Sequence, residues 1–125
     1  MDTKPLPYLK MYICVLDEFP DFMVPTLVAH SVLGAHQQFQ PTNDSYNEWL
    51  QKSFRKVVVR VNSREFQTIQ ALGTQLVYLG HENNTLGARK ACAVVAPVRS
   101  DSLPNVLKYA KLWKPKEVLN ATETE

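Results

Sequence analysis

In the middle of the chain, the pattern of hydrophobic and polar residues changes from one typical of a strand to one typical of a helix. Residues 56–61 form a β-branched run that is typical of a strand. Asn62 and Ser63 follow, and their side chains can cap a helix that begins near residue 64. The apolar positions of this helix recur at helical spacing and are Phe66, Ile69 and Leu72. A strand followed at once by a helix is therefore predicted here.

A second strand and a polar loop follow this helix. Gly73 is a suitable residue to end the helix, and residues 76–79 form a short apolar run that predicts a strand. Strand–helix–strand units of this length join parallel strands through a right-handed crossover. The polar residues 80–85 would then lie at the carboxyl edge of the sheet, where open α/β sheets usually bind ligands.

The N-terminal part predicts a strand and a long helix. Residues 10–16 form an apolar strand-like run, and residues 17–22 are rich in turn-forming residues. Pro25 suits the start of a helix, which we expect to extend to about Phe39. Its apolar stripe consists of Leu27, Ser31, Ala35 and Phe39, widened by Val28 and Val32.

Two further helices and a strand are expected. Ser45 can cap a short helix to about residue 52, residues 91–97 predict the last strand, and Asp101 with Ser102 can cap a closing helix over residues 103–113. The buried positions expected in these helices are Tyr46, Trp49 and Leu50, followed by Leu103, Val106, Leu107, Ala110 and Trp113.

Length and composition indicate one globular domain. The 125 residues can bury a core without disulfides or metals. A hydrophobic fraction of 45% with 21% charged residues is typical of a soluble protein. We expect a single domain over residues 1–125, with its core at about 8–113 and a polar tail over 114–125. Its fold class is predicted as α/β, a three-layer α/β/α sandwich with a mixed sheet of about four strands.

The same sequence predicts a cytoplasmic protein. No apolar run approaches the roughly 20 residues that cross a bilayer, so we expect no membrane association. Residues 1–10 lack the apolar centre of a signal peptide. Cys14 and Cys92 both fall within predicted strands, which favours two buried reduced thiols over a disulfide.

Several of these segments resemble the type 2 peptidyl-tRNA hydrolase family, over about Lys10 to Trp113. The strand that begins at Lys10 is similar to the first strand of that family. The family's first-helix signature, Gly-Lys-x-Ala-Ala-Gln-x-x-His, falls on residues 25–33, and its Asp-Ala-Gly-Arg-Thr loop falls on residues 81–85. The resemblance implies a homodimer, a tRNA or other RNA partner, and no cofactor.

The resemblance also implies a site whose residues differ from those of the family. The essential lysine falls on Thr26 and the essential aspartate on His81, while the loop threonine is retained as Thr85. The glutamine and histidine of the helix fall on His30 and Leu33. Because four of these five positions differ, the catalytic candidates Thr26, His81 and Thr85 form a degenerate version of the family's site.

The three histidines limit the acid–base chemistry that the chain can perform. They are His30, His36 and His81. Under the resemblance, His30 and His81 face one cleft, where the His81 imidazole could take a proton from water or orient it. The alternative is an idle cleft, because no lysine remains there to stabilise an oxyanion. His36 is expected on the surface.

Metal and thiol chemistry are not predicted. A metal site would need a carboxylate beside His30 and His81, and Glu82 would point away from His81 in an extended segment. Cys14 lies in the middle of a predicted strand, where cysteines are normally inert core residues.

Polar and basic residues near the loop are candidates for ligand contacts. Asn83 and Asn84 suit a turn for conformational reasons alone, but they could also contact a ribose or a terminal adenosine. The net charge of +2 is too small to indicate nucleic-acid binding by itself. Basic residues nevertheless gather at residues 52–60, 89–90 and 108–116, either as solvated surface or as a modest phosphate-contacting patch. The predicted ligand-binding residues are His30, Asn83, Asn84, Arg89 and Lys90.

Three functions therefore stay open. We favour a degenerate member of the family that binds tRNA, other RNA or a nucleotide-like ligand at the carboxyl edge instead of hydrolysing efficiently. The second is an active peptidyl-tRNA ester hydrolase that uses His81 and Thr85. The third is a non-catalytic, dimeric protein-interaction module.

Overall fold

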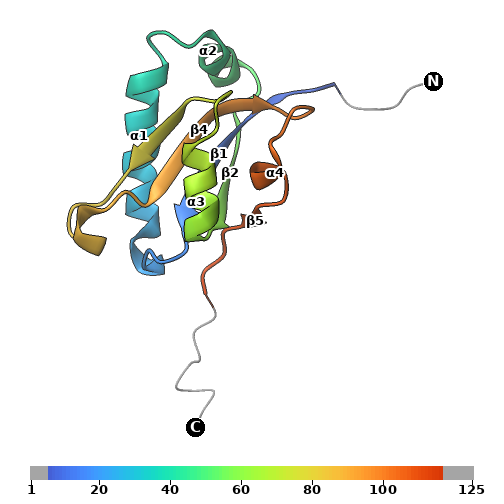
Figure 1. Cartoon of the computed structure of the whole chain (residues 1–125). Coiled ribbons are helices and arrows are strands. Elements are labelled where there is room, and N and C mark those ends of the chain that lie inside the picture. Colours follow the sequence, from blue (N-terminus) through green and yellow to red (C-terminus); the bar gives the residue numbers. More distant parts are fainter. Residues whose placement is uncertain (1–5, 117–125) are drawn as a thin grey trace.

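The computed structural model describes residues 6–116 (Figure 1). Residues 117–125 of the expected polar tail and residues 1–5 of the expected domain lie outside the described residues. The described chain contains five strands, four α-helices and two short 3-10 turns. In chain order these are β1 (Leu9–Leu16), η1 (Asp21–Met23), α1 (Val24–Phe39), α2 (Asp44–Gln51), β2 (Arg55–Val61), α3 (Ser63–Gln70), β3 (Val77–Gly80), η2 (Leu86–Ala88), β4 (Cys92–Arg99), α4 (Asn105–Lys108) and β5 (Lys111–Leu112).

The strands form one open mixed sheet in the order β3-β4-β1-β2-β5. β1 pairs with β2 in parallel and with β4 antiparallel, and β3 is antiparallel to β4. β3 therefore runs parallel to β2, as predicted, but the crossover between them passes over β4 and β1 to the far edge. The α/β class and the mixed sheet are confirmed. The sheet has five strands instead of about four because β5 pairs with the other edge of β2.

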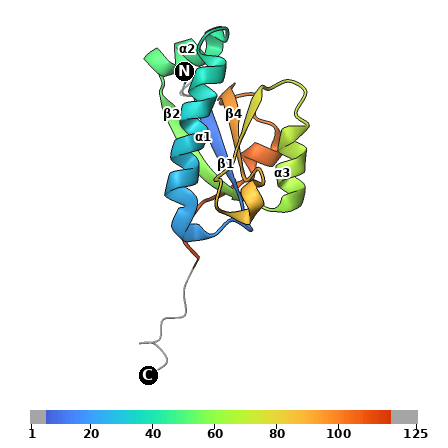
Figure 2. The same cartoon turned by 90° about the vertical axis from the view of Figure 1, so that its left-hand side faces the viewer.

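Helices lie on both faces of this sheet. Figure 2 shows α1 on one side of the strands and α3 on the other. Residues 11–16 of the central strand β1 and residues 92–98 of β4 are all buried, since both of their faces are covered. The stripe predicted for α1 is buried as well. Within residues 6–116, no helix combines the length and the apolar character needed to traverse a bilayer.

Two glycines allow α1 and β3 to approach closely. A methyl group at Gly80 would lie 2.0 Å from the Ser31 hydroxyl oxygen, and one at Gly34 would lie 2.2 Å from the Tyr78 hydroxyl oxygen. Ser31 is fully buried and donates its hydroxyl hydrogen to the Leu27 carbonyl over 2.7 Å. The glycines therefore set the distance between α1 and β3, and with it the shape of the cleft where β3 ends.

Helix α3 begins as the sequence predicts, after an Asn62 cap. The Asn62 side-chain oxygen accepts from the Glu65 amide, and the Glu65 carboxylate accepts from the Asn62 amide, both over 2.8 Å. This reciprocal capping box satisfies two amides that the first turn would otherwise leave free. The helix ends at Gln70, three residues before Gly73, so Gly73 does not terminate it.

The start of α2 differs from the expectation by two residues. Asn43, and not Ser45, is the cap, because its side-chain oxygen accepts from the Tyr46 amide over 2.7 Å. Both residue types cap well, so local sequence did not distinguish them. Tyr46 and Trp49 are buried as predicted.

The prediction of a closing helix over residues 103–113 is wrong. Only α4 is helical there, and its cap position is Pro104, with an extended backbone (φ −60°, ψ 147°). A residue that precedes proline avoids the helical conformation, so a helix capped by Asp101 or Ser102 could not pass through Leu103.

The sheet takes up the rest of that segment. Lys111 pairs with Arg60 and Leu112 with Val59, and the Trp113 amide donates to the Val58 carbonyl over 2.9 Å. Because these backbone groups find partners on β2, the edge strand replaces the predicted last turns of helix.

The two cysteines are buried and unbonded, as predicted. Burial raises the pKa of the Cys92 thiol to about 12, against a smaller lowering by a hydrogen bond with Ser31. Burial also raises the pKa of Cys14, and the neighbouring Cys92 adds to that effect. Neither thiol is a nucleophile at neutral pH.

Candidate functional site

The carboxyl ends of three strands meet at one edge of the sheet. β1, β2 and β3 all run in the same direction, so Leu16, Val61 and Gly80 end at this edge. The loop after β3 continues along it to Ala91, whose amide returns to the Gly80 carbonyl over 2.9 Å. The site predicted from the sequence falls on this loop.

A polar cavity of about 280 Å³ lies between α1 and this loop. It is lined by His30, Tyr78, Gly80, His81, Glu82, Asn83 and Asn84. The structure thus brings His30 and His81 to the same cavity, together with both asparagines. Tyr78 and Gly80 reach it because β3 packs so closely on α1.

Both ring nitrogens of His81 are hydrogen-bonded. Nδ1 lies 3.0 Å from Nζ of Lys90, and Nε2 lies 3.0 Å from Oδ1 of Asn83. Lysine can only donate and the amide oxygen can only accept, so Nδ1 is the acceptor and Nε2 carries the proton. In this arrangement His81 has no free lone pair to offer to a water molecule.

Glu82 stabilises the loop through hydrogen bonds to the residues that follow it. Its side chain is only 7% exposed, and Oε1 accepts from the Asn84 amide over 2.9 Å and from the Thr85 hydroxyl over 2.7 Å. A buried carboxylate is tolerated when it accepts such hydrogen bonds. We expected Glu82 only to point away from His81, and its part in fixing the turn was missed. An acidic residue placed two and three positions before a backbone amide and a hydroxyl is the signal that could have revealed it.

The other two catalytic candidates are less favourably placed. The Thr85 hydroxyl donates to Glu82, which occupies its hydrogen. Thr26 is exposed on α1, one turn before His30, and it is not among the residues that line the cavity. His81, Thr85 and Thr26 thus do not form a joined nucleophile and base.

The basic candidates lie on the other side of the loop. Arg89 and Lys90 line a neighbouring depression of about 300 Å³ with Leu16, Glu18, Ser63, Phe66, Gln67 and Gln70. Arg89 forms an ion pair with Glu18. Lys90 connects the two hollows through its contact with His81. The predicted ligand residues are therefore divided between two adjacent hollows.

A charged cluster fixes the C-terminal segment at the same edge. The Arg60 guanidinium contacts Asp17 over 3.3 Å and Asp21 over 3.2 Å. The Lys116 amide donates to Asp21 over 2.6 Å. This backbone hydrogen bond, with help from Arg60, lowers the pKa of Asp21. The cluster therefore joins η1, β2 and the chain after β5, and it leaves the Arg60 charge paired with two carboxylates.

No metal-binding constellation of three histidine, cysteine or carboxylate side chains occurs among residues 6–116. Besides the Glu82 carboxylate, which accepts from Asn84 and Thr85, the cavity offers imidazole, phenol and amide groups, which suit hydrogen bonding and stacking.

No known family model matches the chain, and no curated protein matches it significantly.

Proposed function

We propose that this protein is a binding protein on a scaffold that resembles the type 2 peptidyl-tRNA hydrolases. Its ligand is the nucleoside end of an RNA or a nucleotide-like molecule, which binds at the carboxyl edge of the sheet. The protein does not cleave an ester efficiently. The observation that carries this proposal is His81, because both of its ring nitrogens are occupied by Lys90 and Asn83. A general base needs a lone pair that faces its substrate.

The lining of the cavity suits a nucleobase and a ribose. His30 and Tyr78 contribute ring systems, and bases stack on such rings. The Asn83 and Asn84 amides can pair with the edge of an adenine or with ribose hydroxyls. The phosphate of such a ligand would meet Lys90 at the rim, since Arg89 is already paired with Glu18.

The active hydrolase remains the second candidate because of Lys90. Its ammonium lies 3.0 Å from His81, so a lysine is present at the loop although the family's lysine position holds Thr26. If a substrate displaced this contact, Lys90 could stabilise an oxyanion while His81 accepted a proton. A cytoplasmic homodimer that binds a protein partner is the third candidate.

A titration of the ¹⁵N-labelled protein with adenosine and with adenosine monophosphate tests the proposal. We expect the amide resonances of residues 80–85 to shift with both ligands, and the monophosphate to bind more tightly through Lys90. His81→Ala should weaken binding at least about tenfold, because the imidazole positions Asn83 and Lys90, which are proposed to contact the ligand, and each lost polar contact removes about 1–3 kcal/mol. Lys108→Gln, on α4, serves as the control and should bind normally. Unchanged resonances at millimolar ligand, or equal binding by the His81→Ala variant, would contradict the proposal.

A further inference from the structure

The opposite end of the sheet carries positive charges that no carboxylate of residues 6–116 neutralises. At the carboxyl edge, Arg60 is paired with Asp17 and Asp21, and Arg89 is paired with Glu18. At the end where β1 and β2 begin, four cations have no carboxylate within 4.0 Å among the described residues. These four residues, here called the basic end, are Lys10, Lys52, Arg55 and Lys56.

The basic end surrounds the first residues of β2. Lys10 and Arg55 are register partners on adjacent parallel strands, so their side chains project from the same face. Lys56 follows on the opposite face, and Lys52 caps the C-terminus of α2. β5 pairs only with Val59 and Arg60, so it leaves this part of the strand open. The four charges can therefore be approached from outside the molecule.

Aromatic rings alternate with these charges. The Arg55 guanidinium lies 3.9 Å from the centre of the Tyr8 ring, and the Lys56 ammonium lies 3.4 Å from the centre of the Phe54 ring. Phe54 is 52% exposed and adopts a left-handed backbone (φ 55°), which is unfavourable for a bulky side chain. The ring already contacts Trp49 and Lys56, and its exposed part is open to an external contact.

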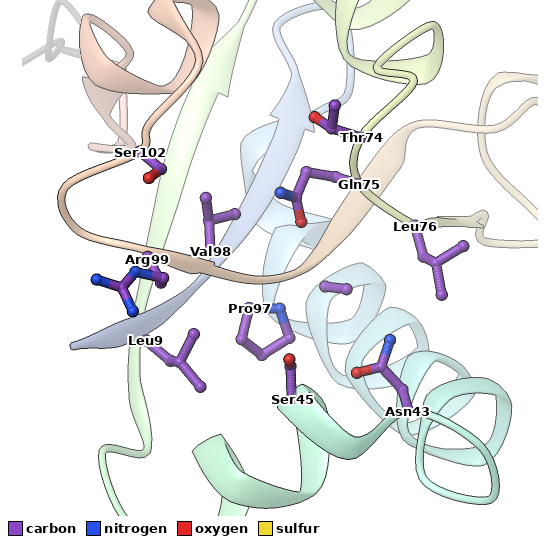
Figure 3. A pocket seen from close by; sticks show the side chains of 11 residues that line it. Leu9, Asn43, Ser45, Thr74, Gln75, Leu76, Pro97, Val98, Arg99 and Ser102 are labelled. Atoms are coloured by element: carbon purple, nitrogen blue, oxygen red, sulfur yellow. The ribbon is translucent and has the colours of Figure 1, made fainter. Parts of the chain in front are cut away.

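A cavity continues this surface along the end of the sheet. It has a volume of about 300 Å³ and lies between Leu9 and Arg99 on one side and Leu76 and Asn43 on the other (Figure 3). Leu9 is the register partner of Arg99 and precedes Lys10. Pro97 and Val98 supply further apolar surface, while the polar groups come from Asn43, Ser45, Thr74, Gln75 and Ser102. The Asn43 oxygen caps α2, which leaves its amide hydrogens available to a ligand. A cavity whose lining combines apolar side chains with amide and hydroxyl groups can hold one nucleobase.

We propose that the basic end and this cavity form a binding surface for single-stranded nucleic acid. The cations contact successive phosphates, the bases stack on Phe54 and on the Arg55–Tyr8 pair, and one base enters the cavity. This combination of charge and exposed rings is how proteins bind single strands without reading their sequence. An acidic protein segment would match the charges but would leave the rings unused. The surface is separate from the pocket at His81, and neither proposal depends on the other.

The test is fluorescence anisotropy with a labelled 15-nucleotide oligo-U RNA and its DNA equivalent, measured at several salt concentrations. The variant Lys10→Gln/Arg55→Gln/Lys56→Gln should bind at least about tenfold more weakly at moderate salt. Its salt slope should fall by about 2, because each phosphate contact on a single strand contributes about 0.7 to that slope. RNA and DNA of equal length should be affected alike if phosphates and bases are the contacts, and a loss confined to RNA would assign the surface to RNA.

The matched control is Lys108→Gln/Lys111→Gln/Lys114→Gln, which removes the same charge from the C-terminal segment. It should change the affinity less than about twofold, and circular dichroism should show both variants folded. Two results would overturn the proposal: an equal loss of affinity in the two variants, or competition by heparin as strong as that by unlabelled RNA. Either would mean that the surface attracts polyanions in general. Absence of oligonucleotide binding by the wild type at 100 µM, roughly the weak limit of non-specific binding, would also overturn it.

Discussion

Replacing Gly80 with alanine should lower the stability of the folded state, although it adds only one methyl group. An added methyl group would lie 2.0 Å from the Ser31 hydroxyl oxygen and 3.2 Å from the Ser31 Cα, so both a side chain and the helix backbone would have to move. We predict that Gly80→Ala lowers the free energy of unfolding by about 1–3 kcal/mol, the usual range for overpacking. Urea denaturation measures this change.

Gly73→Ala is the matched control for that substitution. No atom lies within 4 Å of a methyl group at Gly73, and its backbone is not left-handed. The free energy of unfolding should change by less than about 0.5 kcal/mol or rise slightly. If both alanine variants were equally stable, the close approach of α1 to β3 would be wrong.

The sequence predicted part of the site at this scale. His30 and His81 do reach one cavity, because a helix–strand frame carried each of them to the same edge. The contact of Lys90 with His81 and the burial of Glu82 were not predicted, since both depend on how the loop folds back toward Ala91. Loop conformation is decided by contacts distant in sequence, and local patterns do not contain them.

At the scale of elements, α3 depends on its capping box. Asn62→Ala removes an acceptor for the Glu65 amide, and it should lower the free energy of unfolding by about 1 kcal/mol. Asn62→Asp keeps the acceptor and should be almost neutral. Urea denaturation of the two variants tests the prediction, and a neutral alanine variant would show that the box contributes nothing to stability.

The attachment of the C-terminal segment to η1 should depend on pH. Hydrogen bonds from the Lys116 amide and from Arg60 hold the pKa of Asp21 below its ordinary value of 3.8. A carboxyl whose pKa is lowered by folding stabilises the folded state fully above its unfolded pKa, and that contribution disappears as the pH falls through the folded pKa.

We therefore predict that Asp21→Asn is less stable than the wild type at pH 7, and that the difference shrinks below pH 3.8. Urea denaturation at pH 7 and pH 3 measures both differences. A gap of the same size at both pH values would mean that the carboxylate charge is not what holds Lys116.

The closing segment shows why element prediction failed there. Apolar residues at helical spacing fit the last helix well, but Pro104 prevented an early start and the free edge of β2 offered hydrogen-bond partners to residues 111–113. The competing partner lies some fifty residues away in sequence. Tertiary pairing therefore overrode a reasonable local pattern.

For the whole molecule, the strand-like and helix-like patterns predicted the α/β class and the mixed sheet, but not its fifth strand. Burial within this sheet makes the two thiols inert. We predict that Cys14 and Cys92 do not react with Ellman's reagent in the native protein at pH 7, and that both react in 6 M guanidinium. Rapid native reaction of either thiol would show that the sheet opens or that the core is incomplete.

The most direct test of the central claim, binding without efficient hydrolysis, is single-turnover hydrolysis of an N-blocked aminoacyl-tRNA with protein in excess. We predict that the wild type releases the aminoacyl group no faster than buffer does, and that His81→Ala behaves identically, because the imidazole is held by Lys90 and Asn83. Protein-dependent hydrolysis that disappears in His81→Ala would contradict the claim and establish an esterase with an exchanged base.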